Sequence, residues 1–255
     1  MKRQALEPER FNGMAMYYDA IYADKDYGSE VSFIEDAFRQ HGSNPRHILE
    51  LGCGTGNYTR ALLKRGYDVT AVDVSIHMLD VARSKCNCRL IREDITKISL
   101  GDRFDGCIAM FAVMGYLTED EDVVRALRKV REHLNPGGLF IFDVWNGLAV
   151  VHHLPEVRVK EVNGELVRLT RIAVPALNAA AHTCEVNYTL FVEDMVSSKI
   201  LKFTEHHIMR FFFPREIALL LKNAGFEILR ICPFMELEGK VDENDWNMFI
   251  VARSR

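Results

Sequence analysis

The sequence predicts an α/β protein in which a doubly wound, mostly parallel sheet is joined by a second, antiparallel sheet inserted after its fifth strand. Apolar runs of strand length alternate with helical patterns over residues 31–145, as expected for parallel strands with helices on both faces. Over residues 157–213 apolar and polar side chains alternate, and turn signals such as Asn163-Gly164 separate the runs, which is typical of antiparallel hairpins. Helix and strand patterns then return at residues 214–253 and complete the first sheet.

Each element of the first sheet has its own signal. The expected strands are 47–51, 68–73, 89–92, 106–111 and 139–145, and the expected helices that precede or join them are 31–40, 57–65, 76–85 and 118–134. Ser75 is a suitable N-cap for the helix that follows it, and Thr118 with Glu121 has the spacing of a capping box. The turn residues 135–138, Asn-Pro-Gly-Gly, end the last of these helices.

The inserted sheet and the end of the chain follow. The inserted strands are expected at 157–162, 166–174, 183–192 and 199–212, a helix at 214–223, and an antiparallel strand pair at 226–233 and 245–253. These patterns divide the chain into an N-terminal helical lid (1–45), a core (46–150 and 211–255) and an antiparallel insertion (151–210). We expect the insertion to cover the substrate, to pair two subunits, or to do both.

The loop after the first strand has the composition of a site for an adenosine-bearing cofactor. Glycines at 52, 54 and 56 let the backbone turn sharply and approach a ligand closely, and Asp73, about 20 residues later, can accept hydrogen bonds from ribose hydroxyls. A dinucleotide fingerprint needs its third glycine where this chain has Asn57, and no Gly-Lys-Ser/Thr of a Walker loop follows. Glu50 adds a negative charge that repels a pyrophosphate and attracts a cation. The predicted cofactor is therefore cationic.

Residues 50–56 resemble the first motif of the class I S-adenosylmethionine-dependent methyltransferases, and segments 72–83, 93–95, 104–117 and 134–138 match that family in the same order. The resemblance implies a seven-stranded Rossmann-like sheet, S-adenosylmethionine as cofactor with S-adenosylhomocysteine as product, and no metal. It places Asp73 on the ribose, Asp94 at the adenine amino group, and Met110 with Phe111 beside the sulfonium. The full set of expected cofactor-binding residues is Tyr18, Glu50, Gly52, Cys53, Gly54, Gly56, Asn57, Asp73, Val74, Met78, Asp94, Ile95, Met110 and Phe111.

Four segments, 18–22, 25–30, 110–117 and 202–211, further resemble the nucleotide-linked amino sugar N,N-dimethyltransferases. Those enzymes carry two tryptophans and a proline after strand five, where this chain has Val144-Trp145-Asn146-Gly147. They also carry an arginine before the last strand, where Trp246 lies nearest in this chain. The resemblance implies a small polar acceptor, an amino group on a sugar or a similar metabolite. The alternatives are O-methylation of a small metabolite and a non-catalytic regulatory or assembly protein that binds S-adenosylmethionine.

Methyl transfer from a sulfonium requires placement of the acceptor, desolvation and removal of a proton. Tyr22 matches a tyrosine of the sugar enzymes and is expected to orient the acceptor, although a packed aromatic of the lid is the alternative. Tyr116 follows strand four at the carboxyl edge of the sheet, where open α/β sheets bind ligands. His207 is a candidate base or a buried structural residue, because His206 and His207 must face opposite sides of their strand.

Composition and charge limit the kinds of partner that this protein is expected to bind. A formal net charge of −4 offers no general attraction to nucleic acid. The N-terminus lacks an apolar run behind its basic residues, and no stretch reaches the roughly 18 apolar residues that span a bilayer, so we expect a soluble, cytoplasmic protein without a membrane partner. The pair Cys86 and Cys88 has the wrong spacing for a zinc site. The expected partner is a small molecule, and no metal is expected.

Overall fold

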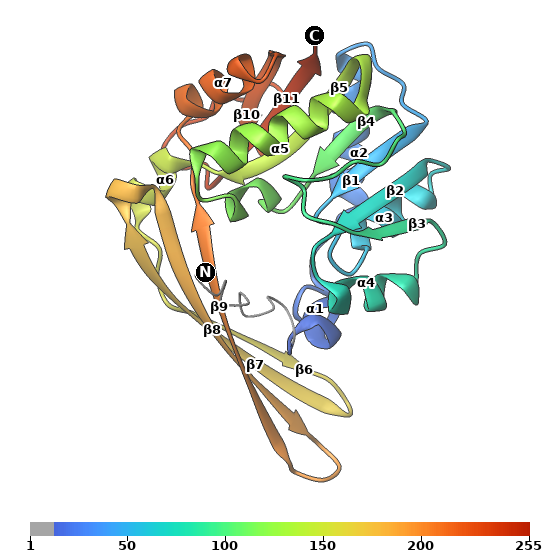
Figure 1. The fold of residues 1–255 in the computed structure, drawn as a ribbon. Coiled ribbons are helices and arrows are strands. Elements are labelled where there is room, and N and C mark those ends of the chain that lie inside the picture. The colour runs from blue at the N-terminus through green and yellow to red at the C-terminus, as the bar shows by residue number, and fades with distance from the viewer. Residues whose placement is uncertain (1–12) are drawn as a thin grey trace, which may run out of the picture.

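The computed structural model describes residues 13–255, and it confirms the predicted fold class (Figure 1). The main sheet has seven strands in the order β10-β11-β5-β4-β1-β2-β3. The strands are β1 His47–Leu51, β2 Asp68–Asp73, β3 Arg89–Arg92, β4 Phe104–Ala109, β5 Leu134–Trp145, β10 Phe226–Pro233 and β11 Asn247–Ser254. The first five are parallel, whereas β11 runs antiparallel to both β5 and β10. Because strand order reverses between β1 and β4, a crevice forms at their carboxyl ends.

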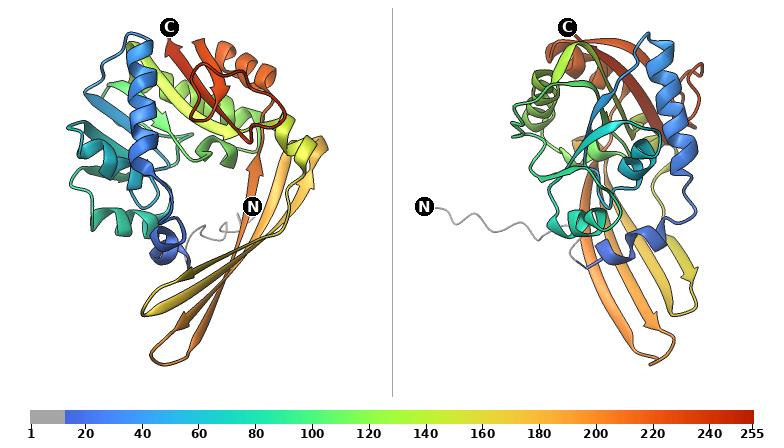
Figure 2. Two further views of the ribbon diagram at one scale, coloured as in Figure 1. Left: turned by 180° about the vertical axis from the view of Figure 1, so that it is seen from behind. Right: turned by 90° about the vertical axis from the view of Figure 1, so that its right-hand side faces the viewer.

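Helices cover both faces of this sheet (Figure 2). On one face lie α2 Tyr27–Gln40, α3 Asn57–Leu63 and α4 Ile76–Arg83, which pack with Ile48, Val69 and Ile108 in one buried cluster. On the other face α5 Asp120–His133 and α7 Pro214–Asn223 pack against Phe140 and Phe142. The five central strands, from β11 to β2, are largely buried on both sides, which explains their continuous apolar runs.

The inserted strands form a separate antiparallel sheet in the order β6-β7-β8-β9. They are β6 Arg158–Asn163, β7 Val167–Asn178, β8 Thr183–Asp194 and β9 Ile200–Arg210. In Figures 1 and 2 this sheet extends as an arm away from the main sheet. Its inner face buries Leu169, Leu190 and Val192 beside Ile21 of the first helix, α1 Ala15–Ile21. Alternation of apolar residues therefore places one face of the arm against the helix that precedes the core. The first 12 residues of the expected lid lie outside the described part of the chain.

The structure corrects the predicted boundary at Thr118. The capping box does not form, because Glu119 is the N-cap of α5 and no side chain caps that end. In place of a cap, acidic residues in the first turn of α5 interact favourably with the positive end of the helix dipole. Strand β5 begins at Leu134 and not at residue 139, since Leu134 already pairs with Phe104. Short helices that the sequence did not reveal are α6 Gly147–His153, η1 Val113–Tyr116 and η2 Ala179–Ala181.

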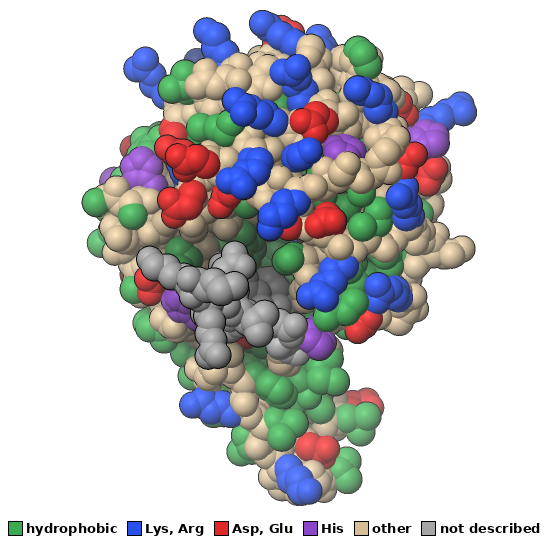
Figure 3. Space-filling view, in the orientation of Figure 1, with side chains coloured by type: hydrophobic (Ala, Val, Ile, Leu, Met, Phe, Trp, Pro, Cys, Tyr) green, Lys and Arg blue, Asp and Glu red, His purple; other side chains and the backbone are tan. Residues whose placement is uncertain are grey.

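Charged side chains of both signs are interspersed over the face that carries α5 (Figure 3). On that helix Arg125 pairs with Asp122 at 3.0 Å and Lys129 with Glu132 at 2.8 Å. The basic residues of α5 thus belong to a solvated face with internal ion pairs. Within residues 13–255, no helix has the length and apolar character needed to cross a membrane.

Candidate active site

A cavity of about 920 Å³ lies between the carboxyl ends of the main strands, helix α1 and the inner face of the inserted sheet. Its volume is within the range of small-molecule sites. Every residue that the sequence predicts for cofactor or acceptor lines this cavity, except Glu50 and Gly56. The candidate site thus gathers residues from Met14, near the start of the described chain, to Asn247 of β11.

The three glycines of the loop after β1 serve different purposes. A Cβ on Gly52 would lie 2.5 Å from a Val113 methyl, and one on Gly56 would lie 2.8 Å from Cys86 Sγ. Close packing therefore requires glycine at both positions. A Cβ on Gly54 would meet no atom within 4 Å, because this residue borders the cavity. All three have positive φ, which glycine adopts without strain. Gly54 therefore leaves the open space that a ligand needs at the start of α3.

Asp73 closes the same corner of the cavity. Its carboxylate accepts hydrogen bonds from the Gly54 and Ser75 amides, both at 2.8 Å, and its side chain is largely buried. Burial raises the pKa of Asp73 above its usual value, while the two amides oppose that rise. Each carboxylate oxygen keeps a second lone pair, which a ribose hydroxyl can occupy. These acceptor sites fit the ribose hydroxyls in the adenosine portion of S-adenosylmethionine.

Further along the cavity, Asp94 and three apolar side chains form a slot. Asp94 accepts hydrogen bonds from the Thr96 amide and hydroxyl at 2.9 and 2.8 Å. Burial acts to raise the pKa of Asp94, but these bonds and a pairing with Lys97 outweigh it and hold the pKa below its usual range. The apolar members of the slot are Val74, Met78 and Ile95. Val74 is 58% exposed, and a flat heterocycle in this slot would cover it.

Glu50 does not have the role that its position in the sequence suggested. It is 2% exposed and accepts a hydrogen bond from the Thr59 hydroxyl of α3 at 2.6 Å, so it points into the protein and not into the cavity. Burial raises the pKa of Glu50 to about 8. Near neutral pH the carboxyl therefore carries little charge, and the predicted attraction of a cation by Glu50 is corrected.

The turn after β4 brings Met110 and Phe111 to the cavity. Phe111 and Ala112 have φ of 69° and 58°, a left-handed conformation that costs energy in residues other than glycine. Asp143 of β5 holds this turn, because its carboxylate accepts hydrogen bonds from both amides. Burial raises the pKa of Asp143 to about 6. Sequence reasoning missed Asp143, although an acidic residue inside an apolar strand was the available signal.

Helix α1 is fastened to the glycine loop by Asp19. Its carboxylate accepts hydrogen bonds from the Thr55 hydroxyl at 2.6 Å and the Asn57 amide at 2.9 Å, and it pairs with Lys85 of the segment after α4. This attachment turns Tyr18 and Tyr22 toward the cavity, with their ring centroids 4.7 Å apart. Burial raises the pKa of Tyr18 well above its usual value, so its hydroxyl stays protonated and can donate.

The inserted sheet supplies the opposite wall. Arg171 donates a hydrogen bond to the Tyr22 hydroxyl at 2.8 Å, and Tyr116 lies 2.9 Å from Nδ1 of His207, measured from its hydroxyl oxygen. His207 is 3% exposed and faces the cavity, whereas His206 is exposed on the other face, as alternation predicts. Trp145 and Trp246 also line the cavity, with their rings edge to face at 5.7 Å. The three predicted catalytic side chains thus border one space.

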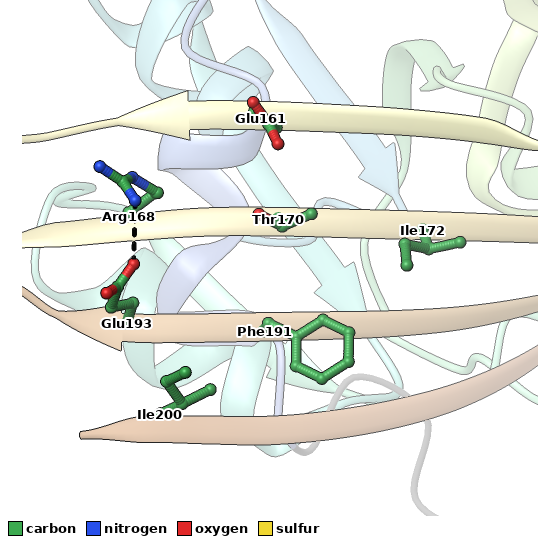
Figure 4. Close-up of a pocket in the computed structure, with 7 residues that line it drawn as sticks. All are labelled: Glu161, Arg168, Thr170, Ile172, Phe191, Glu193 and Ile200. Atoms are coloured by element: carbon green, nitrogen blue, oxygen red, sulfur yellow. Dashed lines mark hydrogen bonds and ion pairs between the residues drawn. The ribbon is translucent and has the colours of Figure 1, made fainter. Parts of the chain in front are cut away.

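A smaller hollow of about 310 Å³ lies on the outer face of the inserted sheet (Figure 4). Arg168 and Glu193 pair across it at 3.2 Å, and Phe191 with Ile200 gives it an apolar side. Its cation is already neutralised by a neighbouring carboxylate. The larger cavity is therefore the candidate active site.

Comparisons with known proteins agree with this geometry. Residues 48–138 match the model of a methyltransferase domain. The dTDP-3-amino-3,4,6-trideoxy-alpha-D-glucopyranose N,N-dimethyltransferase of Streptomyces venezuelae is 27% identical over 220 residues, which cover 83% of this chain and 89% of that enzyme. A solved S-adenosylmethionine-dependent methyltransferase from Clostridium acetobutylicum superposes with a TM-score of 0.81 at 24% identity, over 95% of this chain and 98% of the other. DesVI of Streptomyces venezuelae gives a TM-score of 0.80 at 23% identity, over 93% and 97% of the two chains.

The chain therefore has the class I methyltransferase fold, and its residues 48–138 form a methyltransferase domain. This confirms the class that the sequence motifs predicted. Its resemblance to the amino sugar N,N-dimethyltransferases is confirmed as a similarity at modest identity.

Proposed function

We propose that this enzyme methylates an amino group of a small polar acceptor, a sugar or a similar metabolite, inside the 920 Å³ cavity. The observation that carries the proposal is the division of this cavity into two chemically different halves. The half on the main sheet offers the glycine loop with the carboxylates of Asp73 and Asp94. The half that faces the inserted sheet offers the phenols of Tyr22, Tyr116 and Tyr188, together with the His207 imidazole and the Arg171 guanidinium. Similarity to sugar N-methyltransferases supports the choice of acceptor.

The first half fits S-adenosylmethionine, which supplies an activated methyl group when bound. Asp73 would hold the ribose, and Asp94 would reach the adenine, with Val74 and Ile95 as the walls of the slot. Gly52, Cys53, Gly54 and Asn57 border the loop side of the cavity. Tyr18 would donate to the carboxylate of the amino acid portion, and Met110 with Phe111 would lie beside the sulfonium. Gly56 and Glu50 do not line the cavity, so in this proposal they would support the loop from behind.

The second half would bind the acceptor. The Tyr22 oxygen accepts a hydrogen bond from Arg171, so its own proton is free to point at an acceptor oxygen or nitrogen. The Tyr22 ring also meets Phe111 edge to face at 5.2 Å, which fixes its position beside the methyl-transfer site. Tyr22 thus orients the acceptor. Tyr116 and His207 provide a place for the proton that the acceptor must lose.

O-methylation uses the same arrangement, because a phenol and an imidazole can take a proton from a hydroxyl as well as from an ammonium. A non-catalytic binding protein would have no need of Tyr22, Tyr116 and His207 around one cavity. This clustering favours an enzyme.

The test is transfer of an isotopically labelled methyl group from S-adenosylmethionine. The acceptors are dTDP-3-amino-3,4,6-trideoxy-α-D-glucose as a defined probe and a pool of cellular metabolites. We expect a labelled small-molecule amine with the wild-type protein and little label with Asp73→Ala. Label found on a hydroxyl group would show that the enzyme methylates an oxygen and not a nitrogen of its acceptor. Tight donor binding by calorimetry without any label transfer would contradict the proposal.

A further inference from the structure

Arg171 of β7 lines the cavity and forms no ion pair with any residue that the structure describes. Its Nη1 donates a hydrogen bond to the Tyr22 hydroxyl at 2.8 Å, and its guanidinium lies 5.3 Å and 5.6 Å from the ring centres of Tyr22 and Tyr188. Its Nε is shielded from solvent and has no hydrogen-bond partner within residues 13–255. A guanidinium has five N–H donors, so most of the donors of Arg171 are available to a ligand or to water.

The carboxylates near Arg171 have other partners. Asp24 pairs at 2.6 Å with Lys160, which lies directly opposite Arg171 on β6. Glu205, on the same wall of the cavity, lies 3.0 Å from Nε2 of His207. Neither carboxylate forms an ion pair with Arg171. The cavity therefore contains a partly buried positive charge that lacks a counter-charge in the described part of the chain, and such a charge is costly unless it is paired.

A second cation extends the same wall. Arg158 of β6 lines the cavity, and its guanidinium lies 5.8 Å from the centre of a Trp246 ring. Arg158 pairs with Ala173 and Lys160 pairs with Arg171, so the two arginines are diagonal neighbours whose Cβ atoms lie roughly 7–8 Å apart. Within residues 13–255 Arg158 forms no ion pair either. Two guanidiniums of uncompensated charge thus line one side of the cavity.

The position of Arg171 connects it with the methyl acceptor and not with the donor. Its partner Tyr22 meets Phe111 edge to face at 5.2 Å, beside the proposed site of methyl transfer. The carboxylates proposed to hold the donor, Asp73 and Asp94, belong to the other half of the cavity. The planar fork of an arginine matches the two oxygens of a carboxylate or a phosphate. An oxyanion bound to Arg171 would thus belong to the molecule that carries the attacking amine.

We propose that Arg171, assisted by Arg158, binds an oxyanion of the methyl acceptor, either a carboxylate or a phosphate group. The inference rests on the proposed function and narrows it, because the acceptor is then an amine that also carries an acid. The acid compensates the charge of Arg171 and places the amine beside Tyr22. An amine without an acid leaves Arg171 unpaired and binds weakly.

The chain contains a matched control on the same strand. Arg168 lies three positions before Arg171 and therefore on the outer face, where it pairs with Glu193 at 3.2 Å (Figure 4). It has the same chemistry, but its charge is already compensated and it does not line the large cavity. Arg171→Gln should therefore remove the anion site, whereas Arg168→Gln should leave it unchanged.

The first experiment measures anion binding without turnover. In protein that is saturated with S-adenosylhomocysteine and labelled with nitrogen-15 arginine, the shielded Nε–H of Arg171 gives an NMR signal, assigned by its loss in Arg171→Gln. Acetate and inorganic phosphate, each titrated at constant ionic strength, should shift this signal saturably and leave the Arg168 signal in place. Tighter binding of acetate supports a carboxylate, and tighter binding of phosphate supports a phosphate group. No saturable shift with either anion would overturn the proposal, even if methyl transfer is confirmed.

The second experiment detects the acid in the product. Labelled products formed from the metabolite pool pass over an anion-exchange resin at a pH above the pKa of the amine, where only an acidic product is retained. We expect the label to be retained. Its release after phosphodiesterase and phosphatase treatment would identify a phosphate, and continued retention would identify a carboxylate. Label in an uncharged amine would overturn the inference and leave the proposed function intact.

The third experiment separates acceptor binding from donor binding. With the retained acceptor, Arg171→Gln should raise KM by roughly ten- to hundredfold, the loss expected for a hydrogen-bonded charge, with unchanged affinity for S-adenosylhomocysteine. Arg171→Lys should recover part of the loss because it restores the charge, and Arg168→Gln should match the wild type. An unchanged KM in Arg171→Gln would contradict the inference. A loss of affinity for S-adenosylhomocysteine would also contradict it, because Arg171 would then hold the donor.

Discussion

Replacing Glu50 by Gln isolates the energetic cost of a carboxyl group buried beneath the glycine loop. Glu50 is 2% exposed, and the Thr59 hydroxyl is its hydrogen-bond partner at 2.6 Å. Gln has nearly the same shape as the protonated acid and can accept the same hydrogen bond, but it cannot ionise. The substitution therefore removes the titration of this site and leaves most of its packing in place.

The magnitude follows from the pKa of the folded state, about 8, compared with roughly 4.3 in an unfolded chain. Because the folded state binds this proton more tightly, the contribution of Glu50 to stability is fully present below the unfolded pKa and is lost as pH rises through about 8. Between pH 5 and pH 8 the loss amounts to roughly 3 kcal/mol. Glu50→Gln does not suffer this loss.

The assay is urea unfolding of wild type and Glu50→Gln at a series of pH values from 5 to 8. Other groups titrate in both proteins, so the informative quantity is the difference in unfolding free energy between them. We expect the unfolding free energy of Glu50→Gln, relative to that of the wild type, to rise by roughly 3 kcal/mol from pH 5 to pH 8. A difference that stays constant with pH would refute the reasoning, since it would mean that Glu50 ionises as readily in the folded as in the unfolded state.

Four further changes test the site. Asp73→Ala should weaken binding of S-adenosylmethionine by about 1–3 kcal/mol, the scale for a hydrogen bond to a charged group, and unchanged affinity in a calorimetric titration would count against this placement. Tyr22→Phe should reduce turnover more than donor affinity, and equal kcat in both forms would remove Tyr22 from the mechanism. Asp143→Ala should destabilise the fold by about 2–4 kcal/mol in urea unfolding, because it leaves two amides of a left-handed turn unpaired; a loss near zero would contradict that role. Gly54→Ala should weaken donor affinity by placing a methyl group in the cavity, and full affinity would show that the ligand does not approach this backbone.

The sequence was sufficient for the sheet and for most of the cavity wall. Strand and helix periodicities are local properties, so the order of elements and the arm of hairpins follow from the chain itself. Residues such as Asp73 and Tyr116 could be placed because parallel strands bring their carboxyl ends to a single edge. The alternation of His206 and His207 likewise required only the two-residue period of a strand.

What the sequence did not reveal depends on contacts between distant segments. Asp19 reaches Lys85, and Asp143 reaches the turn after β4, through side chains whose partners no local pattern identifies. His207 of β9 likewise contacts both Glu205 of its own strand and Tyr116 of the distant helix η1. Glu50 was misjudged because its charge was inferred without its burial, and burial reverses the protonation expected of a surface carboxylate.

The most direct test of the central claim is a crystal structure of the protein with S-adenosylhomocysteine. We predict that the ribose hydroxyls contact the Asp73 carboxylate, that the adenine lies in the slot beside Asp94, and that the sulfur faces Phe111 and Tyr22. A ligand bound elsewhere, or one whose ribose leaves Asp73 without contact, would contradict the account.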